Sequence, residues 1–150
     1  GQLAGEQEIL LGVLQNHERK DGKGYPKGIK NEEISSFGRI LAIMDIYDAM
    51  VTNRVYAKRN SPFDVFEVLS VDIRNGRLDT EYGILFIKKV CHALNGSWVM
   101  LSNGDKAKIV YIDESRVNAL PIVQTEAGKF FDLNTMCDVK ITALLMSSEI

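Results

Sequence analysis

The spacing of apolar residues changes near Gly96, from a helical period before it to a two-residue alternation after it. Before this point the pattern predicts four helices. The first ends near Asn16 or His17, and the second runs from Ser35 or Ser36 to about Asn53. The third runs from Ser61-Pro62 to about Asn75, and the fourth runs from Asp79 to Leu94. Each later helix begins with a residue that caps helices well, and Gly76 and Asn95-Gly96 are typical stop signals. An all-α part is therefore expected up to Gly96.

The first two helices each have an apolar stripe that predicts which face is buried. In the first helix the stripe consists of Leu3, Leu10, Val13, Leu14 and His17. In the second helix it consists of Phe37, Ile40, Leu41, Met44, Tyr47 and Val51, and the acid Asp48 lies on this stripe.

After Gly96 the alternation predicts short strands with one apolar face, at residues 98–102, 106–112, 119–125, 129–133 and 139–145. The dipeptide Asn103-Gly104 is a strong hairpin signal, because both residues accept positive φ, and residues 126–128 form a second turn. Such strands suggest a small antiparallel β-roll or barrel. The predicted fold is α+β, with residues 1–96 as a helical domain and residues 97–150 as a β-rich extension.

Composition and charge narrow the class of protein only slightly. The apolar and charged fractions are ordinary for a globular protein, and the net charge of −2 gives no reason to expect a nucleic acid polymer as partner. No apolar run approaches the roughly 20 residues that cross a bilayer, so we expect a cytoplasmic protein without a membrane span. Cys91 and Cys137 are interpreted as small buried residues, not as a disulfide.

The long connection between the first two helices is the first candidate for chemistry. It contains glycines and a proline but no apolar period, and connections of this length in a compact domain are usually functional or disordered. Its glycines let backbone N–H groups approach an anion, while Arg19, Lys20, Lys23, Lys27 and Lys30 supply positive charge. The pattern suits a phosphate. The alternative is a solvated surface loop with turn-forming glycines.

The second candidate is an acid on a face of small residues in the second helix. Gly38, Ala42, Asp45 and Ala49 follow one another at spacings of four, three and four, so they lie on one face. A buried carboxylate is costly unless it is paired or bound to a metal, which makes Asp45 a candidate ligand together with His17. The alternatives are that the acids fix the packing through the backbone or Arg54, and that His17 is a core histidine.

These weak signals gain strength because their order resembles a known family. Residues 16–28 read Asn-His-Glu-Arg-Lys-Asp-Gly-Lys-Gly-Tyr-Pro-Lys-Gly. This resembles the second half of an HD-GYP domain, whose pattern is His-His-Glu, two residues, Asp-Gly, one residue, Gly-Tyr-Pro, one residue, Gly. Further elements follow in the family's order: Arg39-Ile40, Asp45, Tyr47-Asp48-Ala49-Met50 and Arg54-Val55-Tyr56. The resemblance covers about residues 3–95.

The resemblance implies a metal-dependent phosphodiesterase that hydrolyses cyclic di-GMP to the linear dinucleotide or GMP. In that family iron or manganese ions activate water for the attack. It implies metal ligation by His17 and Asp45, with Asn16 at the position of the family's first histidine. It also implies substrate contacts from the following residues: Tyr25, Arg54, Gly24, Pro26 and Lys23. The loop around Gly24 is a surface that the family also uses to contact diguanylate cyclase (GGDEF) domains.

Two departures from the family pattern set the remaining expectations. Asn16 is a weaker, neutral ligand than a histidine, and the His-Asp pair that names the family would lie before residue 1. We expect this chain to be inactive alone, with metal bound weakly or not at all. The alternatives are a degenerate module that binds nucleotide or a cyclase partner, and a phosphohydrolase for another nucleotide. Apolar faces left open by missing helices would favour a homodimer or helix exchange.

Overall fold

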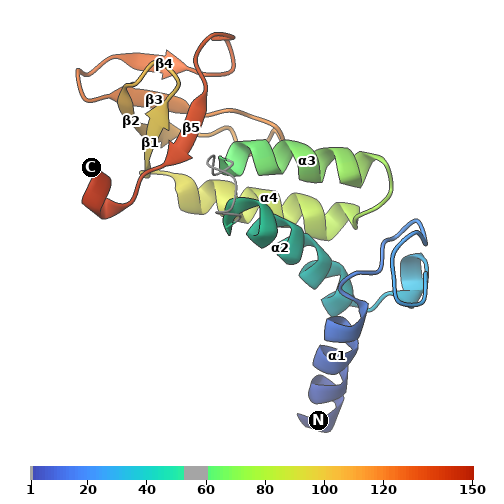
Figure 1. The fold of residues 1–150 in the computed structure, drawn as a ribbon. Coiled ribbons are helices and arrows are strands. Elements are labelled where there is room, and N and C mark those ends of the chain that lie inside the picture. The colour runs from blue at the N-terminus through green and yellow to red at the C-terminus, as the bar shows by residue number, and fades with distance from the viewer. Residues whose placement is uncertain (1, 53–60) are drawn as a thin grey trace. The chain divides into compact units, whose positions relative to one another are not determined.

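The computed structural model of the chain describes residues 2–52 and 61–150 (Figure 1). The helical elements are α1 (Gln2–Gln15), the 3-10 helix η1 (Asn31–Glu33), α2 (Ser36–Thr52), α3 (Pro62–Arg74), α4 (Thr80–Leu94) and the 3-10 helix η2 (Ser147–Glu149). The strands are β1 (Trp98–Leu101), β2 (Lys106–Tyr111), β3 (Ile122–Thr125), β4 (Phe130–Asp132) and β5 (Ile141–Leu144). Helices followed by an antiparallel sheet confirm the predicted α+β class. The expectation for Arg54 lies outside the described residues.

The chain forms two compact units, and the long helices α3 and α4 contribute to both. One unit consists of residues 1–49 and 68–86, and the other consists of residues 50–67 and 87–150. The proposed boundary at Gly96 stays a prediction. None of the described helices combines the length and the apolar character that crossing a membrane requires.

The predicted helix starts and stops are confirmed in their hydrogen bonds. Each capping side chain accepts a backbone N–H of the first turn: Ser35 Oγ from Gly38 (3.1 Å), Ser61 Oγ from Phe63 (3.2 Å) and Asp79 Oδ1 from Tyr82 (2.9 Å). Gly76 and Gly96 end their helices with φ of 73° and 83°, a conformation that glycine adopts without strain. Local signals therefore placed the helix ends correctly.

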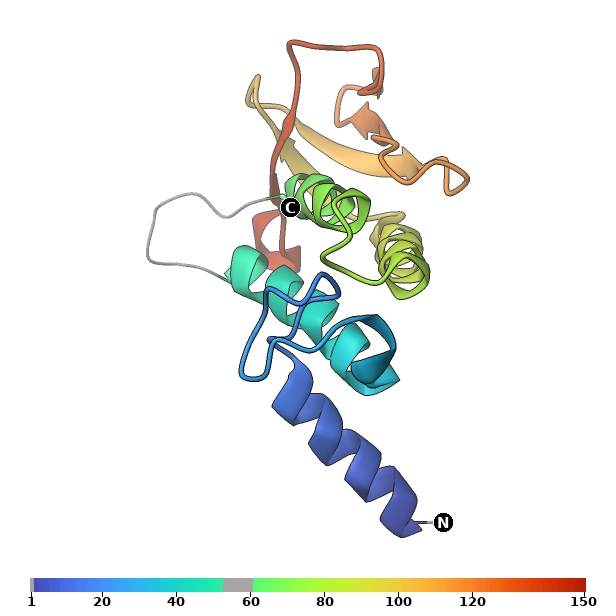
Figure 2. The ribbon, with the colours of Figure 1, turned by 90° about the vertical axis from the view of Figure 1, so that its right-hand side faces the viewer.

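In the first unit, α1 and α2 approach closely through glycines. Figures 1 and 2 both show the end of α1 beside the beginning of α2. A Cβ added at Gly12 would lie 2.5 Å from the Cβ of Phe37, and one at Gly38 would lie 3.0 Å from the Cβ of Gln15. Larger residues at either position would push the helices apart. The contact places the end of α1, where His17 follows, against α2.

The predicted apolar stripe of α1 is wrong, and that of α2 is confirmed only in part, since Ile40, Leu41, Tyr47 and Val51 are half-buried. Leu10 and Leu14 of α1 are 60% and 59% exposed, and Phe37 and Met44 of α2 are exposed as well. The residues of α2 that are buried are Gly38, Ala42 and Ile43. The physical reason is that α1 meets α2 through Gly12 and Gly38, so that Leu10 and Leu14 lie outside the contact.

Arg39 connects the start of α2 with the cap of α4. Its guanidinium donates to the Ile34 carbonyl through Nε (3.0 Å) and to Asp79 Oδ2 through Nη1 (3.3 Å). Both side chains of this ion pair are largely buried, so the loss of either partner would leave an uncompensated charge. The arginine of the motif thus has a structural contact that the sequence did not reveal.

In the second unit, the five strands form one antiparallel sheet in the order β4-β3-β2-β1-β5. Both predicted hairpins are confirmed, and Gly104 and Gly128 hold their turns with φ of 90° and 82°. The inward-facing residues of the central strands are almost completely buried: Val99, Leu101, Ala107, Ile109 and Val123. The two-residue period therefore predicted the buried face of the sheet correctly.

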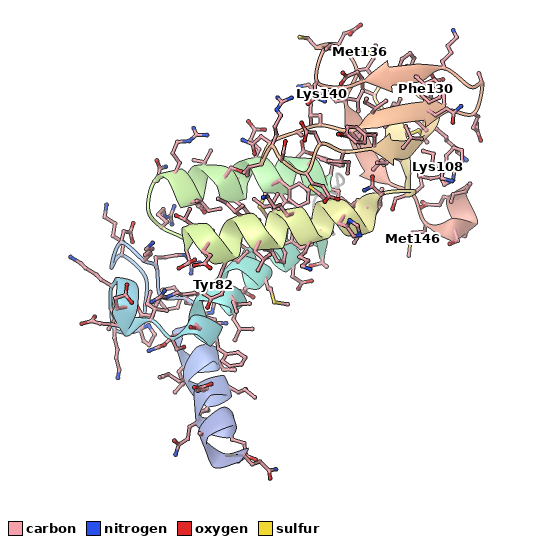
Figure 3. The ribbon with its side chains drawn as sticks, turned by 180° about the vertical axis from the view of Figure 1, so that it is seen from behind. Tyr82, Lys108, Phe130, Met136, Lys140 and Met146 are labelled. Atoms are coloured by element: carbon pink, nitrogen blue, oxygen red, sulfur yellow. The ribbon has the colours of Figure 1, made fainter. Side chains whose placement is uncertain are left out.

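A cavity of about 300 Å³ lies in the second unit, lined by Phe63 and Asp64 of α3 and by the connection between β4 and β5. Figure 3 shows Met136 and Lys140 on this connection. Cys137 also lines the cavity and is exposed, contrary to the prediction that both cysteines are buried. The reason is that it lies on a surface turn, where no core forms. Cys91 is buried as predicted, and both thiols are free.

Candidate functional site

The structure brings His17 and Asp45 together in the first unit. His17 follows α1 and Asp45 lies midway along α2, and the Nδ1 of the imidazole is 3.9 Å from Oδ2 of the carboxylate. The close contact between α1 and α2 at Gly12 and Gly38 accounts for this convergence. The two side chains are 42% and 51% exposed, so the expectation that Asp45 is buried is wrong. On the small-residue face of α2, Gly38 and Ala42 are buried, whereas Asp45 and Ala49 are exposed.

The ring of Tyr25 lies over the imidazole of His17. The two rings are stacked, with centroids 4.8 Å apart and planes inclined by 16°. The Tyr25 N–H also donates to the backbone carbonyl of His17 (3.1 Å). Tyr25 is 62% exposed, so much of its side chain remains open to solvent beside His17.

Gly24 explains why the chain needs a glycine directly before this tyrosine. A Cβ at Gly24 would lie 2.4 Å from the backbone nitrogen of Arg19 and 2.4 Å from the carbonyl oxygen of His17. Neither atom belongs to a flexible side chain, so the loop could not keep this path with any other residue. The glycine therefore lets the loop return onto the residues that follow α1.

Glu18 is the buried group around which this loop closes. Residues 18–30, called the Gly-Tyr-Pro loop from here on, begin with a glutamate that is only 2% exposed. Its Oε1 accepts the N–H of Lys27 (2.6 Å) and its Oε2 accepts the N–H of Ile29 (3.1 Å). In the sequence Glu18 was noted only as part of the family motif, and no structural role was predicted for it. The one signal for its role was an acid at the start of a segment rich in free backbone amides.

Further hydrogen bonds, within the loop and to Arg77, hold the remainder of the Gly-Tyr-Pro loop. Lys20 N–H donates to the Arg77 carbonyl (3.0 Å), Lys23 N–H donates to Asp21 Oδ1 (2.9 Å), and Asp21 pairs with Lys30 in a single antiparallel bridge. The N–H groups of Lys23, Lys27 and Ile29 thus already bind protein carboxylates. These backbone amides therefore bind carboxylates of the chain itself and not an external anion, whereas the lysine side chains at 23, 27 and 30 are exposed.

The other predicted site residues have simpler surroundings. Asn16 accepts a hydrogen bond from Arg19 Nη1 at its backbone carbonyl (3.1 Å). Pro26 follows a cis peptide bond and is exposed, as is Lys23. Arg54 lies in the segment that the structure leaves undescribed. Of the predicted set, Asp45, Tyr25 and Gly24 each lie close to His17.

The donors at this site are of the right kind for a transition metal, but they are few. Imidazole nitrogen and carboxylate oxygen both suit iron, manganese or zinc. Two atoms that bind one ion at about 2.1 Å each lie at most about 4.2 Å apart, so a separation of 3.9 Å is compatible with a shared ion. Within residues 2–52 and 61–150, no group of three His, Cys, Asp or Glu side chains is arranged to hold a metal. His17 and Asp45 thus fit two positions of a larger ligand set.

The comparisons with known proteins all indicate the same family. The HD domain family matches residues 2–81. The cyclic di-GMP phosphodiesterase PdeB of Borreliella burgdorferi is 31% identical over 88% of this chain and 35% of its own length. A cyclic di-GMP phosphodiesterase of Pseudomonas aeruginosa is 35% identical over 61% of this chain and 22% of its own length. A 3'3'-cGAMP-specific phosphodiesterase of Vibrio cholerae is 36% identical over 51% of this chain and 18% of its own length.

The chain thus spans about a third or less of the length of these curated relatives. No solved structure matches it with significant similarity. The family match covers more than half of the chain and includes the His17–Asp45 pair and the Gly-Tyr-Pro loop. The chain therefore belongs to the HD domain family and is related to the HD-GYP cyclic dinucleotide phosphodiesterases.

Proposed function

We propose that this chain is part of a metal-dependent phosphodiesterase for a cyclic dinucleotide, with cyclic di-GMP as the first candidate substrate. The convergence of His17 and Asp45, with Tyr25 stacked on the imidazole, is the observation that carries the proposal. The names of the relatives agree with this substrate class. Residues 1–96 would form part of the HD-GYP domain, and residues 97–150 would form its extension. Action on an intracellular messenger would place the site in the cytoplasm.

His17 and Asp45 would supply two ligands to iron or manganese, with Asn16 as a weaker neighbour. The bound metal would activate water and offset the charge that develops on the phosphoryl oxygens. Two ligands fall short of the number that holds a transition metal firmly, so this chain alone would not turn over substrate. Ligands from other parts of the protein would complete the site.

The Gly-Tyr-Pro loop would bind the dinucleotide beside these ligands. The open face of Tyr25 is suited to stack against a guanine base, because aromatic rings stack on nucleobases at about 1–3 kcal/mol each. The exposed ammonium group of Lys23 would attract the phosphates. Gly24 and Pro26 would shape the backbone that carries this tyrosine, and Arg54 would add a further cation.

A second candidate function is a module that binds the dinucleotide, or a diguanylate cyclase (GGDEF) domain, without hydrolysis. It is favoured by Asn16, which replaces an imidazole with a neutral amide. In this case His17, Tyr25 and the loop would still form the contact surface, and Asp45 would no longer be needed for turnover.

Turnover by the full-length gene product separates the two functions. The protein is loaded with iron(II) or manganese(II) under anaerobic conditions and incubated with cyclic di-GMP or 3'3'-cGAMP, and the products are separated by chromatography. The phosphodiesterase proposal predicts linear dinucleotide or GMP, and Asp45→Asn should lower the rate by about a hundredfold or more, because a metal ligand is lost. Glu81→Gln, an exposed carboxylate of α4, serves as the matched control and should leave the rate unchanged.

Failure to hydrolyse either dinucleotide with both metals would overturn the phosphodiesterase proposal. Calorimetric titration of the same protein with cyclic di-GMP would then test the module: binding that does not require metal would support it. Absence of both turnover and binding would contradict both functions.

A further inference from the structure

We propose that Glu18 is the positioning residue of this site: its buried carboxylate is the anion that the Gly-Tyr-Pro loop encloses, and the closed loop holds Tyr25 against His17. The inference rests on the proposed function only in assigning importance to Tyr25. The positioning itself is a property of the folded chain and is testable without metal or nucleotide.

The first step is the burial of the Glu18 carboxylate. At 2% exposure it has lost its hydration, which costs several kcal/mol unless hydrogen bonds replace the water. Each oxygen accepts one backbone N–H, from Lys27 at 2.6 Å and from Ile29 at 3.1 Å. Hydrogen bonds to a charged acceptor are stronger than neutral ones. Because the two donors lie two residues apart in the loop, the carboxylate fixes both the position and the direction of the backbone at residues 27–29.

The second step connects the hydrogen bonds of Glu18 to the position of Tyr25. The backbone is held at Tyr25 and again two residues later, since the Tyr25 N–H is bonded to the His17 carbonyl and the Lys27 N–H is bonded to Glu18. Gly24 further restricts the backbone before Tyr25, because it packs directly on the backbone of residues 17–19. With the backbone held on both sides, the Tyr25 ring has a defined place over the imidazole, at 4.8 Å.

The third step is the choice of substitution. Glu18→Gln keeps the size of the side chain but replaces one acceptor oxygen with an NH2 group, which would face a backbone N–H. One of the two loop amides would lose its partner, and a buried unpaired donor is costly. Glu33→Gln is a matched control, because Glu33 Oε2 also accepts a backbone N–H, from Lys30 at 3.2 Å, but is exposed and lies outside the loop.

The test uses the ring signals of histidine in NMR spectra of this chain. The chain has only two histidines, His17 and His92, so substitution of His92 assigns the signals. A stacked aromatic ring shifts the protons beneath it, and Tyr25→Ala defines the full size of this shift at His17. Glu18→Gln should remove most of that shift and leave the His92 signals in place. Glu33→Gln should leave both histidines unchanged.

An unchanged His17 signal in a folded Glu18→Gln protein would overturn the proposal. Since this variant could fail to fold, amide hydrogen exchange in the unaltered chain provides an independent test. The amides of Lys27 and Ile29 should exchange at least about tenfold more slowly than unprotected amides, because each is bonded to a buried carboxylate. Exchange of both at the unprotected rate would also overturn it. A positive result combined with absent hydrolysis would refute the phosphodiesterase and leave the positioning role intact.

Discussion

At the scale of single residues, the site depends on contacts made close to His17. The motif was enough to predict that His17 and Asp45 converge, because His17 directly follows α1 and Asp45 lies midway along α2. The burial of Glu18 could not be predicted, since it depends on a loop that closes across nine residues of chain. The same holds for Gly24, whose need for glycine comes from the backbone that it touches and not from a positive φ.

Gly24→Ala should destabilise the first unit by about 1–3 kcal/mol, because the added methyl group meets backbone atoms that cannot move aside. Urea unfolding followed by circular dichroism measures the effect. Gly5→Ala is the control: nothing lies within 4 Å of its added Cβ, and alanine favours a helix, so stability should rise slightly. Equal stability of Gly24→Ala and the unaltered chain would contradict the close contact.

The two thiols should differ sharply in reactivity. Burial, with a smaller contribution from the nearby charge of Glu114, raises the pKa of Cys91 to about 11, so it stays a neutral thiol at pH 8. Cys137 is exposed. A thiol-reactive dye at pH 8 should therefore label Cys137 at once and Cys91 only after unfolding. Rapid labelling of two thiols in the folded protein, read by mass spectrometry, would show that Cys91 is accessible.

At the scale of elements, signals that act within one turn were reliable and signals that depend on a partner were not. Ser61 and Asp79 cap α3 and α4 as the sequence predicts, because a cap needs only its own helix. The buried face of α1 was predicted wrongly and that of α2 only in part correctly, because the helices meet through Gly12 and Gly38. In the sheet each inward position alternates with an outward one, so the pattern was sufficient there.

The cap of α2 distinguishes two neighbouring serines that the sequence left open. Ser35 Oγ accepts the Gly38 N–H, whereas Ser36 is the exposed first residue of the helix. Ser35→Ala should therefore lower the free energy of unfolding by about 1 kcal/mol, and Ser36→Ala should change it by much less. Denaturant titration measures both variants. A larger loss for Ser36→Ala would mean that the helix begins one residue later.

At the scale of the whole molecule, the change of period at Gly96 was sufficient to predict an α+β protein. The sequence could not predict that α3 and α4 contribute to both compact units, since this depends on contacts between distant segments. The apolar side chains of α1 remain exposed: Ile9, Leu10, Leu11, Val13 and Leu14. A continuous apolar surface of this kind marks a place where another element binds.

Self-association through α1 is the expected consequence for this chain in isolation. Light scattering should give a mass above that of one chain at micromolar concentration, and Leu10→Gln with Leu14→Gln should return it toward the monomer. Phe130→Gln is the control, because Phe130 is as exposed as these leucines but stands on β4. A monomer at all concentrations would contradict the expectation that the α1 surface drives association.

The most direct measurement for the whole account is a double-mutant cycle on metal affinity. Manganese(II) binding to the full-length gene product is followed by electron paramagnetic resonance for the unaltered protein, His17→Ala, Asp45→Ala and the double variant. If both side chains bind one ion, each single substitution should weaken binding at least about tenfold, and the second substitution should add little to the first. Additive losses, or no loss from either substitution, would show that His17 and Asp45 do not share a ligand.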